Sequence, residues 1–494
     1  MRGVLVAAAF FSFPFRIKSA QSNITNLEAP TEIVVPATFD PPQAFKNINL
    51  VHIINLEKNF PRETVNVVVE NVDNAPQDEY YISFTSEQMK AVGALEVRDR
   101  NDLDKGSLEL QTIRVENEEE IQYYRIKLPK PIIPKSQITL GISFSYLSAF
   151  NPRPKAIPQA GNQFLEYEFS ALALSPYPTL NQKTEIKFPN SNVPEYTKIP
   201  ELDGKAEFPI KAGSKLIYGP FSITPARATK PVKVRYQFTK PLIHVSSLER
   251  DIEVSHWGGN IAFEERYRLR NRAANLSDLF SRVEWASSAQ FNPQTTAIRE
   301  FNIPLKVGSL SPYYVDIIGN VSTSRFRSNK HEAKLEIKPR YPIFGGWKYP
   351  FRIGWDSDSK NYLRKLKARD GYALNVPFLE GPKQAEGVEY KSVEVRIILP
   401  EGARNVKYST NISLISANIS LHKTFMDTIG RTTLTLAAKN IFDNQRDQEL
   451  IVTYDYPLIA TLRKPFVLFS GFLSLFVGAW LAGSLDLSIR AKAV

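Results

Sequence analysis

The commonest pattern along this chain is a strict alternation of apolar and polar residues. From Ile138 to Tyr146 every second residue is apolar, and small or polar residues lie between them. The same alternation recurs from Val232 to Phe238 and from Val393 to Ile397. A period of two predicts strands with one face in a core and the other in water, as in antiparallel sheets. We therefore predict a mainly β protein.

Helical periodicity is scarce before the C-terminal region. The stretch from Asn361 to Arg369 is one of the few short helical candidates. Many short strands in a chain with 34 prolines predict β-sandwich-like domains rather than a helical or α/β fold.

A faint internal repeat suggests how many such domains there are. Four strand-like stretches in the first half resemble four in the second half, in the same order and roughly 210 residues apart. Chance similarity between generic strands is the alternative interpretation. We predict two tandem β domains, over residues 23–240 and 241–460. The matched positions are Ile126-Lys127 with Ile337-Lys338, Tyr146 with Trp355, Pro189 with Pro400, and Tyr236 with Tyr454.

The C-terminal region contains a run of 21 uncharged residues from Pro465 to Leu485. As an α-helix this run would be about 31 Å long, which matches the roughly 30 Å hydrocarbon core of a bilayer. Charged residues flank it on both sides. We predict one transmembrane helix over residues 463–485 and a short cytosolic tail over residues 486–494.

The N-terminus has the pattern of a secretory signal peptide. An apolar stretch from Gly3 to Phe15 follows Arg2 and precedes a small-residue cleavage motif at Ala20-Gln21-Ser22. We predict a signal peptide over residues 1–22. With one late membrane helix, this places the bulk of the chain in the lumen as a type I membrane protein.

Five Asn-x-Ser/Thr sequons fit a lumenal location. Each triplet alone is weak because it arises often by chance. Behind a signal peptide they become N-glycosylation candidates, and Asn23 is the weakest because it adjoins the cleavage site. The candidates are Asn23, Asn275, Asn320, Asn411 and Asn418.

Composition narrows the class further. The chain has no cysteine, so its lumenal domains must be stabilised by large cores rather than by disulfides. The formal net charge is +11, which favours anionic surroundings such as lipid headgroups, although the basic residues are spread as on ordinary solvated strands. Nucleic acid is not an expected partner of a lumenal protein.

No catalytic, cofactor or metal site is predicted. Five histidines are scattered without metal-ligand spacing, and no phosphate loop or nucleophile elbow occurs. Two Asp-x-Asp pairs have a spacing that could hold a divalent cation against a sugar diphosphate. A solvated turn is the favoured interpretation of both. The pairs are Asp102 with Asp104 and Asp356 with Asp358.

The aromatic stretch from Tyr341 to Trp355 permits two interpretations. With Arg340, Lys348 and Arg352 it could form a platform for sugars or headgroups. Its aromatic residues share one parity, however, after a Gly345-Gly346 turn. We favour a half-buried strand.

The membrane run also contains a stripe of small residues. They recur every four positions, so they share one face of the predicted helix. Small residues let helices approach closely in lipid, and we predict a packing face for another membrane helix. An ordinary apolar span is the alternative. The stripe consists of Ser470, Ser474, Gly478 and Ala482.

Several longer stretches resemble the ribophorin I family, a subunit of the oligosaccharyltransferase complex of the endoplasmic reticulum. The resemblance is clearest at RDIEVSHWGGN, from Arg250 to Asn260, and covers the lumenal region and the membrane helix. The other matching stretches are SPYPT from Ser175, FSR from Phe280, YY followed by IGNVSTS from Tyr313 to Ser324, PRYPIFGGWK from Pro339, and ILPEGARN from Ile398.

The resemblance implies a non-catalytic subunit of a hetero-oligomeric complex. That complex transfers a preassembled oligosaccharide from dolichyl pyrophosphate to asparagine in the sequons of nascent polypeptides, and catalysis lies in a separate subunit. The expected partners are the other subunits, including the catalytic one, together with membrane lipids and nascent polypeptide. The expected location is the endoplasmic reticulum membrane, and the expected roles are complex stability and acceptor handling.

One departure concerns the C-terminus. Animal members of the family continue into a cytosolic helical domain associated with ribosome and translocon docking, whereas this sequence ends at Val494 without a dilysine signal. We therefore do not expect direct ribosome binding through this subunit, and we expect residence in the endoplasmic reticulum to depend on assembly.

Two hypotheses from other classes stay open at this point. One is a membrane-anchored glycosyltransferase that uses Asp356 and Asp358, and the other is a lumenal or cell-surface glycan-binding protein. Replacement of both aspartates by alanine would test the first, and surface labelling would test the second.

Overall fold

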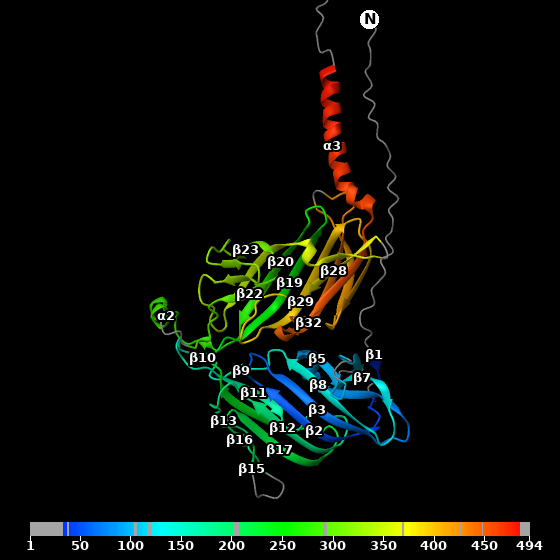
Figure 1. Ribbon diagram of the computed structural model, residues 1–494. Coiled ribbons are helices and arrows are strands. Elements are labelled where there is room, and N and C mark those ends of the chain that lie inside the picture. Colours follow the sequence, from blue (N-terminus) through cyan, green and yellow to red (C-terminus); the bar gives the residue numbers. More distant parts are fainter. Residues whose placement is uncertain are drawn as a thin grey trace, which may run out of the picture.

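Figure 1 shows the computed structural model of the chain. The predicted signal peptide, Asn23, Asp104 and the tail after residue 485 lie outside the residues that the structure describes. The described residues are 33–36, 39–102, 106–115, 121–200, 207–289, 294–367, 370–424, 427–446 and 448–484.

Seven strands in the first half form one large sheet. The two central strands run parallel to each other, and every other neighbouring pair is antiparallel. In spatial order the strands are β16 (Ile210–Ala212), β17 (Lys215–Thr224), β12 (Thr179–Lys187), β2 (Phe45–Asn55), β3 (Arg62–Asn71), β8 (Gln137–Tyr146) and β5 (Val92–Asp99).

Two smaller sheets of four strands pack on the inner face of this sheet. Buried residues of the large sheet join one apolar cluster under each smaller sheet. One smaller sheet has the order β1 (Ile33–Val35), β6 (Glu109–Val115), β7 (Ile121–Ile132) and β4 (Gln77–Thr85), and the other has the order β13 (Glu195–Tyr196), β18 (Pro231–Gln237), β11 (Phe164–Ser170) and β9 (Asn151–Pro152).

The second half again contains one large sheet with two smaller ones. The large sheet has the order β23 (Ser309–Asp316), β26 (Lys348–Asp358), β20 (Asn260–Asn271), β19 (Ile243–Ser255), β29 (Glu389–Glu401), β32 (Arg431–Phe442) and β31 (Ser416–His422). The smaller sheets are β22 (Phe301–Leu305), β25 (Ala333–Ile337) and β24 (Arg325–Ser328), and β27 (Leu363–Lys365), β28 (Gly371–Pro377), β33 (Glu449–Asp455) and β30 (Arg404–Thr410).

The remaining elements are short, except for the last helix. They are α1 (Ser86–Ala91), α2 (Arg282–Ala289), η2 (Ser359–Asn361), η3 (Asp443–Gln445), β10 (Ala156–Ile157), β14 (Ile199–Pro200), β15 (Glu207–Phe208), β21 (Asn275–Leu276) and α3 (Leu458–Ser484). Of these, β10 and β21 pair in parallel and so join the two halves.

The two halves share one strand topology, which the faint sequence repeat indicated. Each large sheet is built on a central parallel pair, β2 with β12 and β19 with β29, and the flanking strands follow in the same chain order. The matched sequence positions mark equivalent strands: β7 with β25, β8 with β26, β12 with β29, and β18 with β33. Pro189 lies just outside its strand, two residues after the end of β12. We call strands β1–β18 the first unit and strands β19–β33 the second unit.

The fold class is the predicted one, mainly β with two tandem sandwich-like units and one C-terminal apolar helix. Buried residues from Ile243 to Tyr456 form a single cluster that contains no residue of the first unit. This supports a division near Lys240, and we keep the domain bounds 23–240 and 241–460 as a proposal.

The strand predicted through the aromatic stretch is confirmed as β26. Tyr349, Phe351, Ile353 and Trp355 are all buried, and Trp347 packs against the same core. The stretch therefore belongs to the core and does not form an exposed aromatic platform.

The short helix predicted from Asn361 to Arg369 is wrong. The chain forms the 3-10 turn η2 up to Asn361 and then the edge strand β27, which pairs with β28. Tyr362 between them is buried and contacts the ring of Phe263. Burial of this ring and strand pairing outweigh the weak helix propensity of the segment.

The first unit packs against the end of the second unit that is remote from α3 (Figure 1). Phe60 of the first unit stacks near Phe442 of the second, with ring centroids 4.6 Å apart. Beside them, Lys58 Nζ lies 2.9 Å from Asp443 Oδ2. This small apolar contact and the partly buried ion pair are therefore among the contacts that join the two units.

Candidate functional site: the joint between the membrane helix and the second unit

The apolar helix begins earlier than the sequence indicates. α3 starts at Leu458, five residues before the predicted start, and Pro465 lies inside it. By length and composition it is the one candidate membrane span among the described residues. Its first two turns therefore precede the apolar run and are available to contact the β units.

Pro465 leaves one helical carbonyl without its usual partner, because proline has no backbone N–H to donate to the residue four positions earlier. That residue is Thr461. Trp257 Nε1 of the β19–β20 turn donates to the Thr461 carbonyl oxygen at 3.3 Å. An indole from the β body thus supplies the hydrogen bond that the proline removes.

An aromatic cluster lies directly beside this contact. His256 contacts the rings of Tyr372 and Tyr456, with centroids 4.4 and 4.6 Å away. His256 Nε2 is 2.8 Å from the hydroxyl oxygen of Tyr454. Burial lowers the pKa of His256 to about 4. The ring is therefore neutral at physiological pH and serves as a packing and hydrogen-bonding group.

An ionic network holds the next turn of the helix. Lys464 Nζ and Arg431 Nε both lie 3.2 Å from Oδ1 of Asp427, whose side chain is fully buried. Burial alone would raise the pKa of Asp427. Hydrogen bonds from the Thr424 N–H and hydroxyl, and then from Arg431 and Lys464, outweigh burial and hold the pKa well below its ordinary value. The carboxylate is therefore ionised wherever the protein is folded near neutrality.

A glycine permits the close approach of the helix. A Cβ at Gly402 would lie 2.8 Å from the Cβ of Ala460, and the glycine has φ +94°. Any other residue would both strain this turn and push the first turn of α3 away. Together these contacts fix the helix to the membrane-proximal end of the second unit, at the joint visible in Figure 1.

The joint is expected to weaken in acid. A histidine whose pKa is lower in the folded than in the unfolded state contributes stability above about pH 6.5, and this contribution is lost as the pH falls toward 4. Between pH 7.5 and 5 we expect a loss of about 1 kcal/mol, because His256 is only partly shielded from solvent. Thermal unfolding of the detergent-solubilised chain at both pH values measures it. His256→Phe should show a smaller pH dependence, and an equal one would contradict the role of this ring.

The RDIEVSHWGGN stretch forms the hairpin that carries the joint. Behind its tip, Arg250 is fully buried and contacts the carboxylates of Glu265 and Glu380, the latter at 2.6 Å. The sequence analysis missed this triad. The sequence did contain a pattern that predicts the burial of Arg250. Along the strand Arg250 alternates in step with the apolar residues Ile252 and Val254, so its side chain lies on the same, buried face.

The comparisons with known proteins decide the family. The family model described as Ribophorin I matches residues 45–483, which is most of the chain. This chain belongs to the ribophorin I family.

The relatives from several eukaryotes are all named as forms of subunit 1 of one glycosyltransferase. Dolichyl-diphosphooligosaccharide–protein glycosyltransferase subunit 1 of Caenorhabditis elegans is 31% identical over 434 residues, covering 88% of this chain and 71% of the relative. Subunit 1B of Arabidopsis thaliana is 28% identical, covering 92% and 96%. Subunit 1 of Schizosaccharomyces pombe is 28% identical, covering 84% and 89%.

Solved structures add little. An M1 zinc metallopeptidase from Deinococcus radiodurans aligns with 42% of this chain and 42% of its own at 11% identity and a TM-score of 0.27. Yeast LTA4 hydrolase with bestatin aligns with 46% of this chain and 33% of its own at 12% identity and a TM-score of 0.29. These likenesses are too weak to bear on the fold or function of this ribophorin I family member.

The Asp-x-Asp pair of this ribophorin I chain is engaged locally. Asp356 and Asp358 lie at the end of β26 and not in the expected solvated turn. Asp356 accepts a hydrogen bond from Asn260, and Asp358 caps η2 by accepting from the Lys360 N–H. Among the described residues, no group of three or more His, Cys, Asp or Glu side chains is arranged to hold a metal ion.

The other predicted positions are accessible in this ribophorin I chain. Asn275, Asn320, Asn411 and Asn418 are all exposed. Ser474, Gly478 and Ala482 of the stripe are exposed on α3, and the hydroxyl of Ser474 donates to the carbonyl of Ser470 at 2.7 Å. The stripe and the sequons stay predictions.

Proposed function

We propose that this chain is a non-catalytic subunit of the oligosaccharyltransferase complex, which transfers an oligosaccharide from dolichyl diphosphate to asparagine in polypeptide sequons. Membership in the ribophorin I family supports the proposal, as do relatives named as subunit 1 of dolichyl-diphosphooligosaccharide–protein glycosyltransferase. Its partners are then the other subunits, including the catalytic one, membrane lipids and the acceptor polypeptide.

The joint at the base of α3 is the observation that carries the scaffolding part of this proposal. Three independent contacts, at Trp257, Gly402 and Asp427, bind the helix to the second unit. A simple anchor needs only a flexible tether. A fixed helix holds both β units in one orientation to the membrane, which is what a subunit that positions others requires.

The engaged carboxylates support the non-catalytic part. Asp356 and Asp358 have the best spacing for a cation in the chain, yet one oxygen of each already accepts a hydrogen bond, from Asn260 and from the Lys360 N–H of η2. We therefore favour a structural role for them over the glycosyltransferase hypothesis.

The proposed location is the endoplasmic reticulum membrane, with the β units in the lumen and the C-terminus in the cytosol. The predicted signal peptide and the exposed sequons support this orientation. Asn320 is the best candidate for glycan attachment, because it lies in a family-like stretch on an exposed turn after β23.

Assembly through the small-residue stripe provides the test. In mild detergent we expect the wild-type chain to migrate in a multi-subunit assembly and Gly478→Leu to migrate largely outside it. Apart from the adjoining backbone of α3, no described residue lies within 4 Å of a Cβ at Gly478, so we attribute a loss of assembly to a partner helix.

Phe476→Leu, on a different face of α3, is the matched control and should assemble normally. Monomeric migration of the wild type would contradict the subunit proposal. Normal assembly of Gly478→Leu would contradict only the packing role of the stripe.

A further inference from the structure

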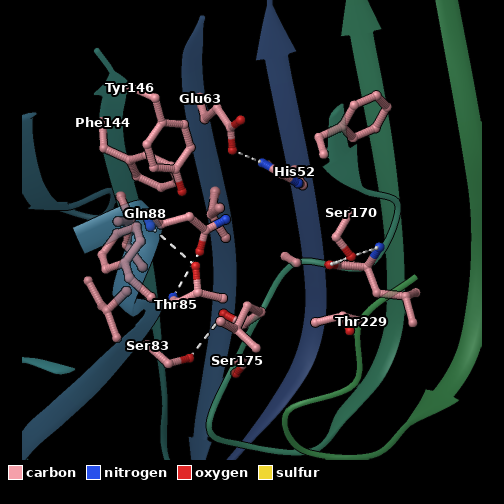
Figure 2. A pocket seen from close by; sticks show the side chains of 18 of the residues that line it. His52, Glu63, Ser83, Thr85, Gln88, Phe144, Tyr146, Ser170, Ser175 and Thr229 are labelled. Carbon is pink, nitrogen blue, oxygen red and sulfur yellow. Dashed lines mark hydrogen bonds and ion pairs between the residues drawn. The ribbon is translucent and has the colours of Figure 1, made fainter. Parts of the chain in front are cut away.

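A cleft of about 750 Å³ opens in the first unit. It lies on the inner face of the large sheet, between the two smaller sheets that pack there. Strands β2, β3 and β8 form its floor, and β4 with α1 on one side and β11 on the other form its walls (Figure 2). The buried apolar residues divide here into separate clusters under the two smaller sheets. The cleft therefore lies at the boundary between the two apolar clusters.

The floor of the cleft contains a polar group in an otherwise apolar surface. With one oxygen Glu63 lies 2.7 Å from His52 Nε2 (Figure 2). With the other it accepts a hydrogen bond from the hydroxyl of Tyr167 at 2.5 Å. His52 is 5% exposed, and its Nδ1 has no hydrogen-bond partner among the described residues. A buried polar atom without a partner carries a desolvation cost, and in this unit the floor of the cleft bears that cost at His52.

The second unit has a pocket of about 690 Å³ at the corresponding place, between β22 and β28, so an opening between the smaller sheets is common to both units. The floors beneath the two openings differ. His52 pairs with Thr184 across the parallel junction of the first unit, and Arg250 pairs with Val395 across that of the second. The two positions are equivalent, five residues before Pro189 and Pro400 on the partner strands. Arg250 is fully buried with its carboxylates, whereas His52 and Glu63 line the cleft of the first unit.

The lining is acidic in a chain whose formal net charge is +11. Three glutamates line the cleft, and no lysine or arginine does. Glu87 and Glu168 at the rim are exposed and form ion pairs with Lys90 and Lys233. Glu63 on the floor is bonded to a histidine and a phenol instead. The cleft is electrostatically complementary to a cation.

The neighbouring phenols remain neutral donors. Burial, and then the charge of Glu63, raise the pKa of Tyr146 and Tyr167 well above the ordinary value. Aromatic rings line both sides of the floor: Phe84 and Phe144 lie 5.2 Å apart, and Tyr167 stacks on Phe169 at 5.7 Å. The surface around the carboxylate therefore suits apolar and aromatic side chains.

Two strand edges form the walls. Six consecutive residues of β4, Tyr80–Thr85, and four of β11, Tyr167–Ser170, line the cleft. Side chains alternate across a strand, so consecutive lining residues mean that the strand faces the cleft edge-on. Among the described strands β11 pairs only with β18 over these residues, so its other edge is free. β4 pairs only with β7, but the N–H groups of Tyr81 and Thr85 already donate to the Tyr177 hydroxyl and to Gln88 Oε1. A free strand edge is a template for an added extended chain, and here that edge belongs to β11.

We propose that this cleft binds an extended polypeptide segment with apolar side chains and one lysine or arginine. The free edge of β11 receives its backbone, the aromatic walls receive its apolar side chains, and Glu63 receives the cation. A lipid is a poor fit, since the second unit separates the first unit from α3 (Figure 1). The inference rests on the proposed function, in which polypeptide is the acceptor substrate.

Binding of short labelled peptides to the full-length chain in detergent tests the proposal. The probe is a fluorescein-labelled decapeptide of alternating valine and threonine with one central lysine. Matched peptides carry glutamate or norleucine at the centre. By fluorescence anisotropy we expect the lysine peptide to bind at least about tenfold more tightly than the glutamate peptide, because charge complementarity discriminates between them.

Two variants locate the site. Glu63→Gln keeps an acceptor for Tyr167 and should reduce the lysine preference to about threefold or less, with the norleucine peptide unaffected. Thr229→Trp places a large ring at an exposed position of the rim and should weaken all three peptides at least about tenfold. The controls are Glu70→Gln, which faces away from the cleft on the same strand, and Ser222→Trp, exposed on β17.

Three results would overturn the proposal. One is equal affinity for the lysine and glutamate peptides, and another is unchanged binding in Thr229→Trp. The third is binding of chitotriose, or of phosphatidylcholine vesicles, that depends on Glu63 while the peptides do not bind. Migration of the chain in a multi-subunit assembly is unaffected by any of these, so a failure here is separable from a failure of the proposed function.

Discussion

Replacing Arg250 by methionine should destabilise the second unit by about 3–5 kcal/mol, because it leaves two buried carboxylates without their cation. Arg250 is fully buried, and its guanidinium contacts Glu265 and Glu380. Burial raises the pKa of Glu380 and Arg250 opposes that shift, so proton uptake limits the cost. Urea unfolding of the full chain in detergent, followed by tryptophan fluorescence, measures the loss. Trp355 reports locally because its ring lies 5.9 Å from the guanidinium.

Two further variants separate the loss of charge balance from the loss of packing. Arg396→Met removes a partly exposed partner of Asp251 and should cost no more than about 1 kcal/mol. Arg250→Met combined with Glu265→Leu and Glu380→Leu should recover most of the stability, since an apolar replacement of a whole buried triad is often neutral or stabilising. If Arg250→Met lowers the free energy of unfolding no more than Arg396→Met does, then removing Arg250 does not leave an uncompensated buried charge, and this prediction is wrong.

Replacing Gly93 by alanine should force the two units apart at one side of their interface. A Cβ there would lie 1.9 Å from the backbone oxygen of Asn440, and backbone cannot move aside as a flexible side chain can. The Asn440 amide donates to the carbonyls of Lys90 and Val92, both at 2.9 Å, and these bonds would be lost. Overpacking and the loss of two hydrogen bonds should together lower the free energy of unfolding by about 2–4 kcal/mol.

Hydrogen exchange of the full chain tests this, with faster exchange expected in β5 and β32. Gly213→Ala is the matched control. Gly213 also belongs to the first unit, and apart from its chain neighbours no described residue lies within 4 Å of its Cβ position, so the expected effect is the local strain of its φ of +61°. Unchanged exchange in β32 of Gly93→Ala would show that the units do not touch at this point.

The two units show how one topology serves two purposes. In the second unit the position equivalent to His52 is filled by Arg250, and a single core continues beneath the sheets to the joint with α3. In the first unit the same place contains His52 and Glu63, and two cores meet at this polar floor. The continuous core of the second unit suits rigid attachment to the membrane helix, whereas the divided core of the first unit leaves the cleft that we propose for binding.

Sequence alone predicted much of the fold because its signals are local. The alternation from Ile138 to Tyr146 and the aromatic parity before Trp355 each report which face of a strand is buried. The helix predicted from Asn361 failed because it rested on weak propensity in a segment with one buried residue, Tyr362. The start of α3 was placed five residues late, since hydropathy marks the apolar run and not the helical turns before it.

The candidate sites depended on contacts that no local pattern encodes. The Trp257 hydrogen bond to Thr461 joins residues about 200 positions apart. The partners of Arg250 come from the neighbouring strand and from the segment after β28. In the same way, the floor and walls of the cleft are brought together only when the two smaller sheets pack on the large one.

The sequence by itself determined that this protein is mainly β, repeats one plan twice, contains one apolar helix long enough to span a membrane and resembles the ribophorin I family. These features follow from periodicity, composition and motifs, which are properties of neighbouring residues. Only the tertiary structure decided that α3 is fixed to the second unit, that Arg250 is enclosed and that His52 and Glu63 line a cleft at the equivalent position of the first unit. These depend on which distant side chains fill a shared space, and packing determines that after the strands have paired.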